Sequence, residues 1–297
     1  MKIDGVFSGG GVKAYAFIGA LERVYDHNHT FERVAGSSAG AIIAAFLASG
    51  YQFREMDEMI QELDTKKLMD APKWTTFIPF SKWVNLYFQL GLYKGNKLEK
   101  WIHKQLARKK IHTFNDLKPG YLKVIVSDIS LGKLVVIPDD LHRIYGINPD
   151  YFPVAKAVRM SAGFPYFFMP KNIPTKANGK RSLIVDGGLL SNFPLWVFNA
   201  GNNRSKRPVV GMKLNGHPAR EKPREIKNAI DMFQALFSTM LNAHDARYVS
   251  TSEKENIIFL PVDHVETTDF ELNPTARERL IRTGKDQAQE FLKYWPN

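Results

Sequence analysis

The first fifty residues alternate twice between a short apolar run and a longer segment with helical spacing. The run over 2–8 ends at a glycine cluster, which predicts a strand followed by a tight turn. Apolar residues then recur at helical intervals over 16–24, which predicts a helix. A second strand over 31–35 ends at Gly36, and the small apolar residues over 39–49 predict a buried helix.

The strand–helix–strand order predicts that the first two strands pair in parallel with a right-handed crossover, because the helix between them returns the chain to the edge of the sheet where the first strand began. Both glycine-containing turns then fall at the same edge of one sheet. The first turn contains Gly9, Gly10 and Gly11, and the second contains Gly36-Ser37-Ser38-Ala39-Gly40. We therefore expect the two loops to meet.

The rest of the chain predicts a scaffold of further strands and helices. We expect strands over 122–129, 134–137, 208–214 and 256–262, with the first two forming a hairpin, and helices over 96–107, 225–248 and 274–292. At 44% hydrophobic content and 297 residues, the chain can bury one large core, and no Pro/Gly/Ser-rich linker divides it. We predict an α/β fold in a single domain over 1–297, with mixed layers of helix and sheet.

The second turn carries candidate chemistry. In a G-x-S-x-G elbow, the serine sits on a strained turn between strand and helix, and its hydroxyl is exposed; Ser38 occupies that position between Gly36 and Gly40. A glycine run at a helix N-terminus presents free amides for an oxyanion, which makes Gly9, Gly10 and Gly11 candidate donors. The alternative is that Ser37 or Ser38 only caps the following helix.

A third segment, residues 183–190, runs from an apolar strand into Asp186, Gly187 and Gly188. Removal from water raises the pKa of a carboxyl group, so a desolvated Asp186 is a better proton acceptor than an exposed one. This favours a general base. The alternative is that Asp186 begins a turn with Gly187 and bonds only its own backbone.

The first glycine cluster also has to be compared with two nucleotide-binding motifs. Residues 9–14 fit G-x-G-x-x-A after a strand, but the acidic residue expected about 20 positions on is replaced by the serine elbow. A phosphate loop is also disfavoured, because Lys13 lacks both the spacer before it and the Ser or Thr after it.

Together, the glycine cluster, the Ser38 elbow and the Asp186-Gly187-Gly188 block resemble the patatin-like phospholipase family in order and character. Further family-like blocks are Ser161-Ala162-Gly163-Phe164-Pro165, and Asn192 with Pro194. The resemblance covers about residues 3–200, and we interpret the remaining residues as a C-terminal extension of the same domain. Ala14 is a departure, because a further glycine usually stands there in the family.

The resemblance implies a mainly parallel central sheet sandwiched by helices and a lipid acyl hydrolase with a Ser–Asp pair. Ser38 would be the nucleophile, Asp186 its base, and Gly9, Gly10 and Gly11 the oxyanion hole. Two other functions stay open. An α/β-hydrolase triad orders its members Ser, Asp, His, and the histidines after the aspartate are His217, His244 and His264. A non-catalytic lipid-binding protein is the second.

Composition narrows the cellular setting. The chain has no cysteine, which excludes disulfides and thiolate metal sites and agrees with a reducing cytosol. We find no signal-peptide pattern and no membrane-spanning apolar run, and expect a cytoplasmic protein, with peripheral membrane binding left open. No calcium-loop spacing is present, so we expect activity without a metal or cofactor.

The partner that we expect is a lipid or a membrane-surface substrate. The net charge of +11 favours anionic head groups, whereas the scattered basic residues and the lack of a recognised motif argue against specific nucleic-acid binding. Aromatic and aliphatic residues crowd the segment 74–92, which suits a lid or a membrane contact, with a core helix as the alternative. Head group, acyl length, positional preference, transacylation and oligomeric state are left open.

Overall fold

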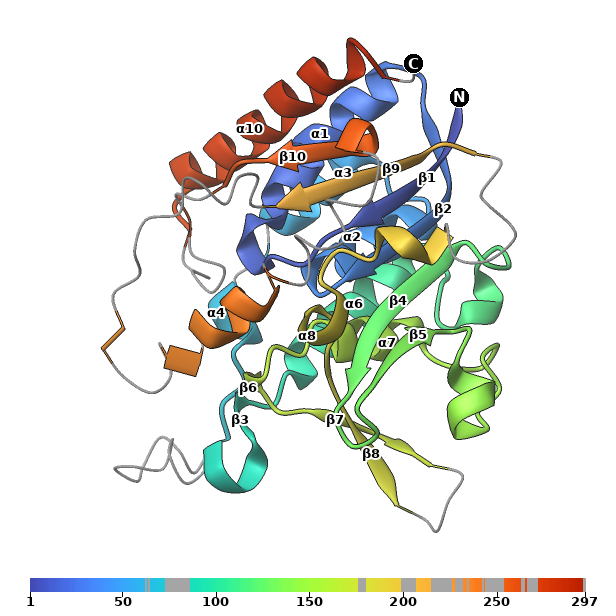
Figure 1. Ribbon diagram of the computed structural model, residues 1–297, viewed down its shortest axis with the longest axis vertical. Helices are drawn as coiled ribbons and strands as arrows, with labels where there is room; N and C mark the ends of the chain where they lie inside the picture. The colour runs from blue at the N-terminus through green and yellow to red at the C-terminus, as the bar shows by residue number, and fades with distance from the viewer. Residues whose placement is uncertain are drawn as a thin grey trace.

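The computed structural model describes residues 1–61, 63, 65–72, 86–175, 180–198, 207–214, 226–227, 232–233, 235–241, 243, 254–262, 265 and 272–295. The strands are β1 (Lys2–Phe7), β2 (Thr30–Ser37), β3 (Gly91–Tyr93), β4 (Leu122–Asp128), β5 (Lys133–Ile137), β6 (Tyr166–Phe168), β7 (Lys171–Pro174), β8 (Arg181–Asp186), β9 (Val209–Leu214) and β10 (Ile257–Leu260) (Figure 1). The α-helices are α1 (Tyr15–Asp26), α2 (Ala39–Ala48), α3 (Phe53–Gln61), α4 (Thr65–Leu68), α6 (Asn96–Arg108), α7 (Val154–Ser161), α8 (Gly188–Ser191) and α10 (Pro274–Leu292). Short helical turns are η1 (Gly11–Ala14), η3 (Phe114–Asp116), η4 (Leu141–Tyr145), η5 (Leu195–Phe198) and η7 (Lys254–Asn256).

The central sheet has the strand order β10-β9-β1-β2-β4-β8-β7, with β5 also paired to β4. The strands from β10 to β4 are parallel to their neighbours, whereas β5, β8 and β7 join by antiparallel pairing. A separate small sheet pairs β3 with β6 in parallel. The central sheet is therefore parallel from β10 to β4, and the antiparallel strands join at β4, where β8 pairs along the same edge as β2 and β5 pairs along the opposite edge.

Strand β4 positions two other strands end to end. Its first half pairs with β2, so that Ile125 lies opposite Ser37. Its second half pairs with β8, so that the next residue, Val126, lies opposite Asp186. Because β2 runs parallel to β4 and β8 runs antiparallel to it, the carboxyl ends of β2 and β8 meet.

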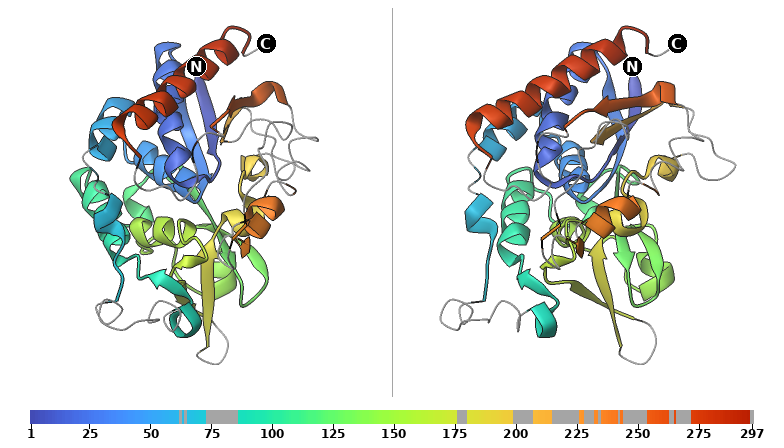
Figure 2. Two further views of the ribbon diagram at one scale, coloured as in Figure 1. Left: turned by 90° about the vertical axis from the view of Figure 1, so that its left-hand side faces the viewer. Right: turned by 60° about the vertical axis from the view of Figure 1, so that its left-hand side comes forward.

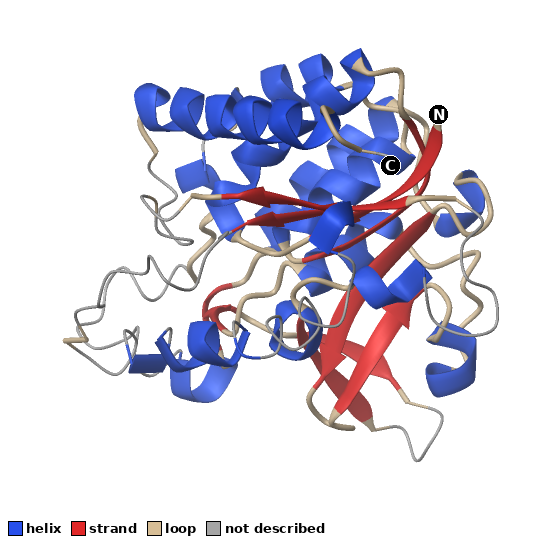
Figure 3. Cartoon of the chain, turned by 45° about the horizontal axis from the view of Figure 1, so that its top comes forward, coloured by secondary structure: helices blue, strands red, loops and turns tan. Residues whose placement is uncertain are grey.

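Alternating side chains give the sheet two apolar faces. In β1, Ile3 and Phe7 join the larger core cluster, which includes residues of α1, α2, α7 and α10. Val6 joins a smaller cluster with Phe193 and Leu195 on the other face. Figure 3 shows most of the helices on one side of the strands, so the covering of the two faces is unequal.

The C-terminal helix packs directly on the first helix (Figure 2). A Cβ on Gly19 of α1 would come within 1.9 Å of the Ile281 carbonyl oxygen, and one on Gly284 of α10 within 1.9 Å of the Ala16 carbonyl oxygen. Only glycine allows the two backbones to approach so closely. Strands β9 and β10 extend the same sheet. The single domain over 1–297 stays a prediction, and these contacts favour it.

The predicted α/β fold with a mostly parallel sheet is confirmed. The expected hairpin is β4–β5, and the helices expected over 96–107 and 274–292 are α6 and α10. The helix expected over 225–248 lies in large part outside the described residues. None of the described helices has both the length and the apolar character that crossing a membrane requires.

Candidate active site

Ser38 lies on the turn between β2 and α2 with backbone angles φ 53° and ψ −126°. A non-glycine residue rarely adopts a positive φ, and such strain is concentrated at functional sites. Ser38 is the N-cap residue of α2, yet its side chain makes no capping hydrogen bond. Instead its hydroxyl donates to Asp186 Oδ2 at 2.7 Å. The cap alternative for Ser38 is therefore wrong.

Asp186 ends β8 and is only 1% exposed. Its two oxygens have different partners. Oδ2 accepts from the Ser38 hydroxyl, and Oδ1 accepts from the Gly188 amide at 2.8 Å. The turn alternative is thus correct for one oxygen, while the other oxygen faces the elbow serine.

Burial raises the pKa of Asp186 to about 7. Removal from water is the main cause, and the hydrogen bonds from Ser38 and the Gly188 amide lower the pKa against it. A carboxylate with a pKa near neutrality is a stronger base than an exposed aspartate while still ionised in a large fraction of molecules.

The glycine loop after β1 meets the elbow as expected. A Cβ on Gly9 would lie 3.0 Å from Ser38 Cβ. The Gly9 amide donates to the Asn192 carbonyl at 3.0 Å, so it is engaged already. The amides of Gly10 and Gly11 have no acceptor among the described residues. We therefore narrow the predicted oxyanion donors to Gly10 and Gly11, with Gly9 supporting the loop.

Close backbone approach explains the glycines that flank the serine and follow the aspartate. A Cβ on Gly40 would come within 2.4 Å of the Phe7 carbonyl oxygen, and one on Gly36 within 2.3 Å of the Gly40 carbonyl oxygen. A Cβ on Gly187 would come within 2.1 Å of the Ile125 carbonyl oxygen. Side chains at these positions would push apart the loops that form the site.

The end of α7 fastens the two candidate residues to each other. Ser161 Oγ accepts from the Ser38 amide at 3.0 Å and donates to the Ile125 carbonyl at 2.6 Å. The Asp186 amide donates to the Gly163 carbonyl at 3.1 Å. The block over 161–165 therefore supports both sides of the Ser38–Asp186 contact.

An apolar pocket of about 160 Å³ opens beside Ser38. Helices α2, α3 and α6, the segment around α4, and strand β6 contribute to its wall. The lining includes Ile42, Ile60, Leu68, Leu98, Trp101, Phe164 and Phe167. Such a lining fits a hydrocarbon chain and offers little to a charged or strongly polar ligand.

Several residues that the sequence singled out lie outside the described part of the chain. The three histidines of the triad alternative, His217, His244 and His264, lie outside the described residues, as does most of the aromatic segment 74–92. In the described end of that segment, Tyr87 and Phe88 are 77% and 72% exposed. Within the described ranges, no three His, Asp or Glu side chains are grouped so as to hold a metal ion.

Sequence reasoning overlooked two polar residues near the pocket, Arg159 and Asp70. Arg159 lies within an apolar stretch of α7, just before the small-residue block over 161–165. A lone arginine at a buried helical position is a usable signal, because arginine is rarely buried without partners. Asp70 has no comparable sequence signal, since its partners are backbone amides 25 residues and more away.

Comparisons with known proteins found one family model and several similar proteins. The model of the family described as "Patatin-like phospholipase" matches residues 5–199. The chain is 50% identical to the uncharacterized protein YqhO of Bacillus subtilis (strain 168) over 297 residues, which are 99% of each chain. It is 25% identical to the uncharacterized protein R571 of Acanthamoeba polyphaga mimivirus, covering 96% of this chain and 92% of that one.

Two solved structures share the fold. VipD from Legionella pneumophila aligns with a TM-score of 0.57 and 19% identity, over 98% of this chain and 66% of that chain. The type III effector protein ExoU of Pseudomonas aeruginosa aligns with a TM-score of 0.51 and 16% identity, over 98% of this chain and 53% of that one. The chain thus spans about two-thirds and about half the length of these two proteins.

Proposed function

Because this chain belongs to the patatin-like phospholipase family, we propose that it hydrolyses lipid acyl esters with Ser38 as nucleophile and Asp186 as general base. The observation that carries the proposal is the hydrogen bond from Ser38 Oγ to the buried Asp186 carboxylate, beside an apolar pocket. A nucleophile, a base with a pKa near 7 and room for a hydrocarbon chain lie within one site.

In the first half-reaction, the Ser38 proton passes to Asp186 Oδ2 as Oγ attacks the ester carbonyl carbon. The carbonyl oxygen becomes an oxyanion, which the amides of Gly10 and Gly11 receive. The intermediate collapses when the bond from the carbonyl carbon to the leaving oxygen breaks. Asp186 returns its proton to that oxygen, and an acyl ester on Ser38 remains.

In the second half-reaction, water attacks the acyl carbon while Asp186 takes one of its protons. The second oxyanion occupies the same amide site, and its collapse restores the Ser38 hydroxyl with the proton from Asp186. The fatty acid then leaves. Because a carboxylate is a weak base toward an alcohol, the pair depends on the dry environment and on the donors of the glycine loop.

A fluorophosphonate probe and a lipid panel test the proposal together. We expect the probe to label the wild type covalently and to spare Ser38→Ala. On a panel of phospholipid, lysophospholipid, triacylglycerol and a soluble ester, both Ser38→Ala and Asp186→Asn are expected to lose activity. A wild type that binds these lipids but is neither labelled nor active would identify a lipid-binding protein.

The triad alternative makes a different prediction for the histidines. Under the Ser–Asp mechanism, alanine at His217, His244 or His264 leaves turnover within a few-fold of the wild type. Loss from any one of them as large as the loss from Ser38→Ala would replace the pair with a triad.

We also propose that the substrate reaches the pocket from a lipid surface. Exposed apolar side chains follow a connected path: Leu90 precedes Gly91, which pairs with Tyr166, and the Tyr166 ring lies 4.5 Å from Phe233. Phe233 is followed at helical spacing by Phe237, whose ring lies 4.9 Å from the pocket residue Phe164. The exposed members of this path are Tyr87, Phe88, Leu90, Tyr166, Met232, Leu236 and Met240.

Apolar side chains of this kind insert at a membrane interface, and the net charge of +11 adds attraction to anionic head groups. We expect sedimentation with vesicles that contain phosphatidylglycerol, and a several-fold weaker association of the double variant Tyr87→Ser and Phe88→Ser. Its turnover of a soluble ester should match the wild type. Equal sedimentation of the two proteins would contradict the proposed contact.

A further inference from the structure

Arg159 is the largest of the completely buried side chains in the described structure. A buried charge is normally paired with an opposite charge. Among the described residues, however, no carboxylate forms an ion pair with Arg159. Its guanidinium is held by backbone carbonyls instead, which raises the question of what the charge does there.

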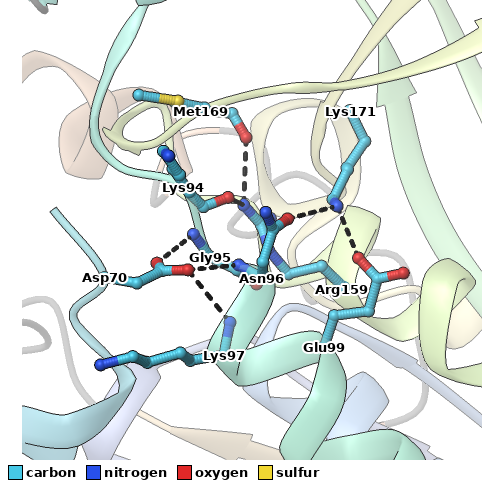
Figure 4. Close-up of polar contacts among 9 residues, drawn as sticks. All are labelled: Asp70, Lys94, Gly95, Asn96, Lys97, Glu99, Arg159, Met169 and Lys171. Carbon is cyan, nitrogen blue, oxygen red and sulfur yellow. Dashed lines mark hydrogen bonds and ion pairs between the residues drawn. The ribbon is translucent and has the colours of Figure 1, made fainter. Parts of the chain in front are cut away.

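The carbonyl partners of Arg159 lie where β3 and β6 end (Figure 4). Nε donates to the Gly95 carbonyl at 2.9 Å, and Nη2 donates to those of Lys94 and Met169 at 3.1 and 3.0 Å. The guanidinium also lies 4.7 Å from the centre of the Phe168 ring. Arg159 therefore fastens the ends of both strands of the small sheet, which supplies pocket residues, to α7.

Asp70 completes the arrangement from the other side of Gly95. Its carboxylate accepts from the amides of Gly95, Asn96 and Lys97 at 2.5, 2.9 and 3.1 Å, at the start of α6 (Figure 4). Negative charge is favourable at a helix N-terminus. Gly95 thus donates its N–H to the anionic Asp70 and accepts at its carbonyl oxygen from the cationic Arg159.

The same arginine reaches the loop that supports the reacting residues. A Cβ on Gly163 would come within 3.2 Å of Arg159 Nη1, the guanidinium nitrogen that is buried and has no hydrogen-bond partner among the described residues. The Gly163 carbonyl accepts from the Asp186 amide, and Ser161 accepts from the Ser38 amide. Arg159 therefore contacts both the pocket wall and the support of the Ser38–Asp186 contact.

Resting on the proposed function, we propose that Arg159 is a positioning residue for the ester hydrolysis: it fixes the pocket wall to the α7 end and stabilises the ionised Asp186 across the Gly163 loop. The first part follows from its three carbonyl contacts. The second follows from the position of its charge: Nη1 lies beside Gly163, whose carbonyl accepts from the Asp186 amide, and the charge of Asp186 acts on the guanidinium together with those of Glu99 and Asp70.

The electrostatic effect has a defined sign. Burial lowers the pKa of Arg159 to about 10, so the guanidinium is charged at neutral pH. Burial raises the pKa of Asp186, and the hydrogen bonds from Ser38 and the Gly188 amide and, after them, the charge of Arg159 lower it. Removing the charge therefore raises the pKa of Asp186. The fall of kcat/KM toward low pH, the acid limb of the pH profile, then moves to higher pH.

Three substitutions separate the two parts. Arg159→Met removes charge and donors, Arg159→Gln removes the charge but keeps N–H donors, and Arg159→Lys keeps the charge with a different donor geometry. The readouts are the pH profile of kcat/KM on p-nitrophenyl butyrate, and the ratio of kcat/KM values for p-nitrophenyl palmitate and butyrate. Lys156→Met, on the same helix with its cation near Phe152, is the matched control.

We expect the acid limb to move up by about half a pH unit in the Met and Gln variants and to stay in place in the Lys variant. We expect the palmitate-to-butyrate ratio to fall about fivefold in the Met and Lys variants. If the Met variant does not fold, the Gln variant still tests the shift of the acid limb, and the Lys variant still tests the palmitate-to-butyrate ratio. Folded variants with the wild-type limb and the wild-type ratio would overturn the inference.

The same assays identify a failure of the proposed function. Equal rates for the wild type and Ser38→Ala would overturn the Ser–Asp hydrolysis itself. Equal profiles for the wild type and the Arg159 variants, with Ser38→Ala inactive, would overturn only the positioning role.

Discussion

The two edges of the parallel strands each bury an aspartate, but in opposite ways. Asp4, near the amino end of β1, is completely buried and forms ion pairs with Arg33 and Arg207. Asp186, at the edge where β1 and β2 end, is 1% exposed, and its carboxylate has a hydroxyl and an amide as its partners among the described residues. Burial alone therefore does not identify a reactive acid. Of these two aspartates, the one that we propose to react is the one with which no described cation forms an ion pair.

The largest effect that tests this contrast concerns activity. We expect Asp186→Asn to lower kcat/KM on a soluble ester by about 10³-fold or more, because the amide cannot accept the Ser38 proton. The matched variant Asp4→Asn should stay within about threefold of the wild type. Steady-state kinetics of the two purified proteins decide the point, and a similar loss in both would remove the distinction.

The second effect concerns the stability of the fold, and here we expect the loss in Asp4→Asn. Asp4→Asn leaves two arginines without their buried partner, so we expect the free energy of unfolding to fall by about 2 kcal/mol. Urea unfolding followed by circular dichroism measures it. An Asp4→Asn protein as stable as the wild type would show that the ion pairs of Asp4 do not contribute to the free energy of unfolding.

The third effect is a pH dependence. Since Asp186 must be ionised to act as a base and its pKa is about 7, kcat/KM should fall about tenfold per unit below that pH and level off above it. The profile is measured on a soluble ester, over a range in which the protein stays folded. A limb centred between pH 4 and 5 would mean that the base is an ordinary exposed carboxylate.

The smallest effect is a gain in stability. The pKa of Asp186 is higher in the folded than in the unfolded chain, where it is about 4. The wild type therefore loses stability as the pH rises from 4 to 7, while the ionised carboxylate becomes costly to bury. We expect Asp186→Asn to be more stable by about 1 kcal/mol at pH 8, with a smaller difference at pH 4. A lower stability of the variant at pH 8 would contradict this.

Much of the fold follows from local patterns in the sequence. The apolar runs and their glycine ends predict β1, β2, the β4–β5 hairpin, α6 and α10 because burial of alternate or helically spaced side chains decides these elements. The meeting of the Gly9 loop with the Ser38 turn also follows, since parallel strands bring their carboxyl ends to one edge. These predictions require only neighbouring segments.

What the sequence does not reveal depends on contacts between distant segments. The Gly9 amide donates to the Asn192 carbonyl. This hydrogen bond depends on where the two backbones lie, and the residue types at the two positions do not indicate it. The partners of Arg159 and Asp70 are likewise main-chain atoms, which every residue possesses. A carbonyl or amide partner cannot be recognised from a side-chain pattern, so this network becomes visible only in the folded structure.

The shared edge of β4 has a consequence for the life of the chain in the cell. Ser38 and Asp186 are 148 residues apart along the chain, and their contact depends on two adjacent positions of a strand made between them. A ribosome-bound fragment that carries the serine but has not yet completed β8 lacks the acid altogether. Under the proposed mechanism, the nascent chain therefore stays inactive until β8 is complete, and hydrolysis begins only when the sheet closes.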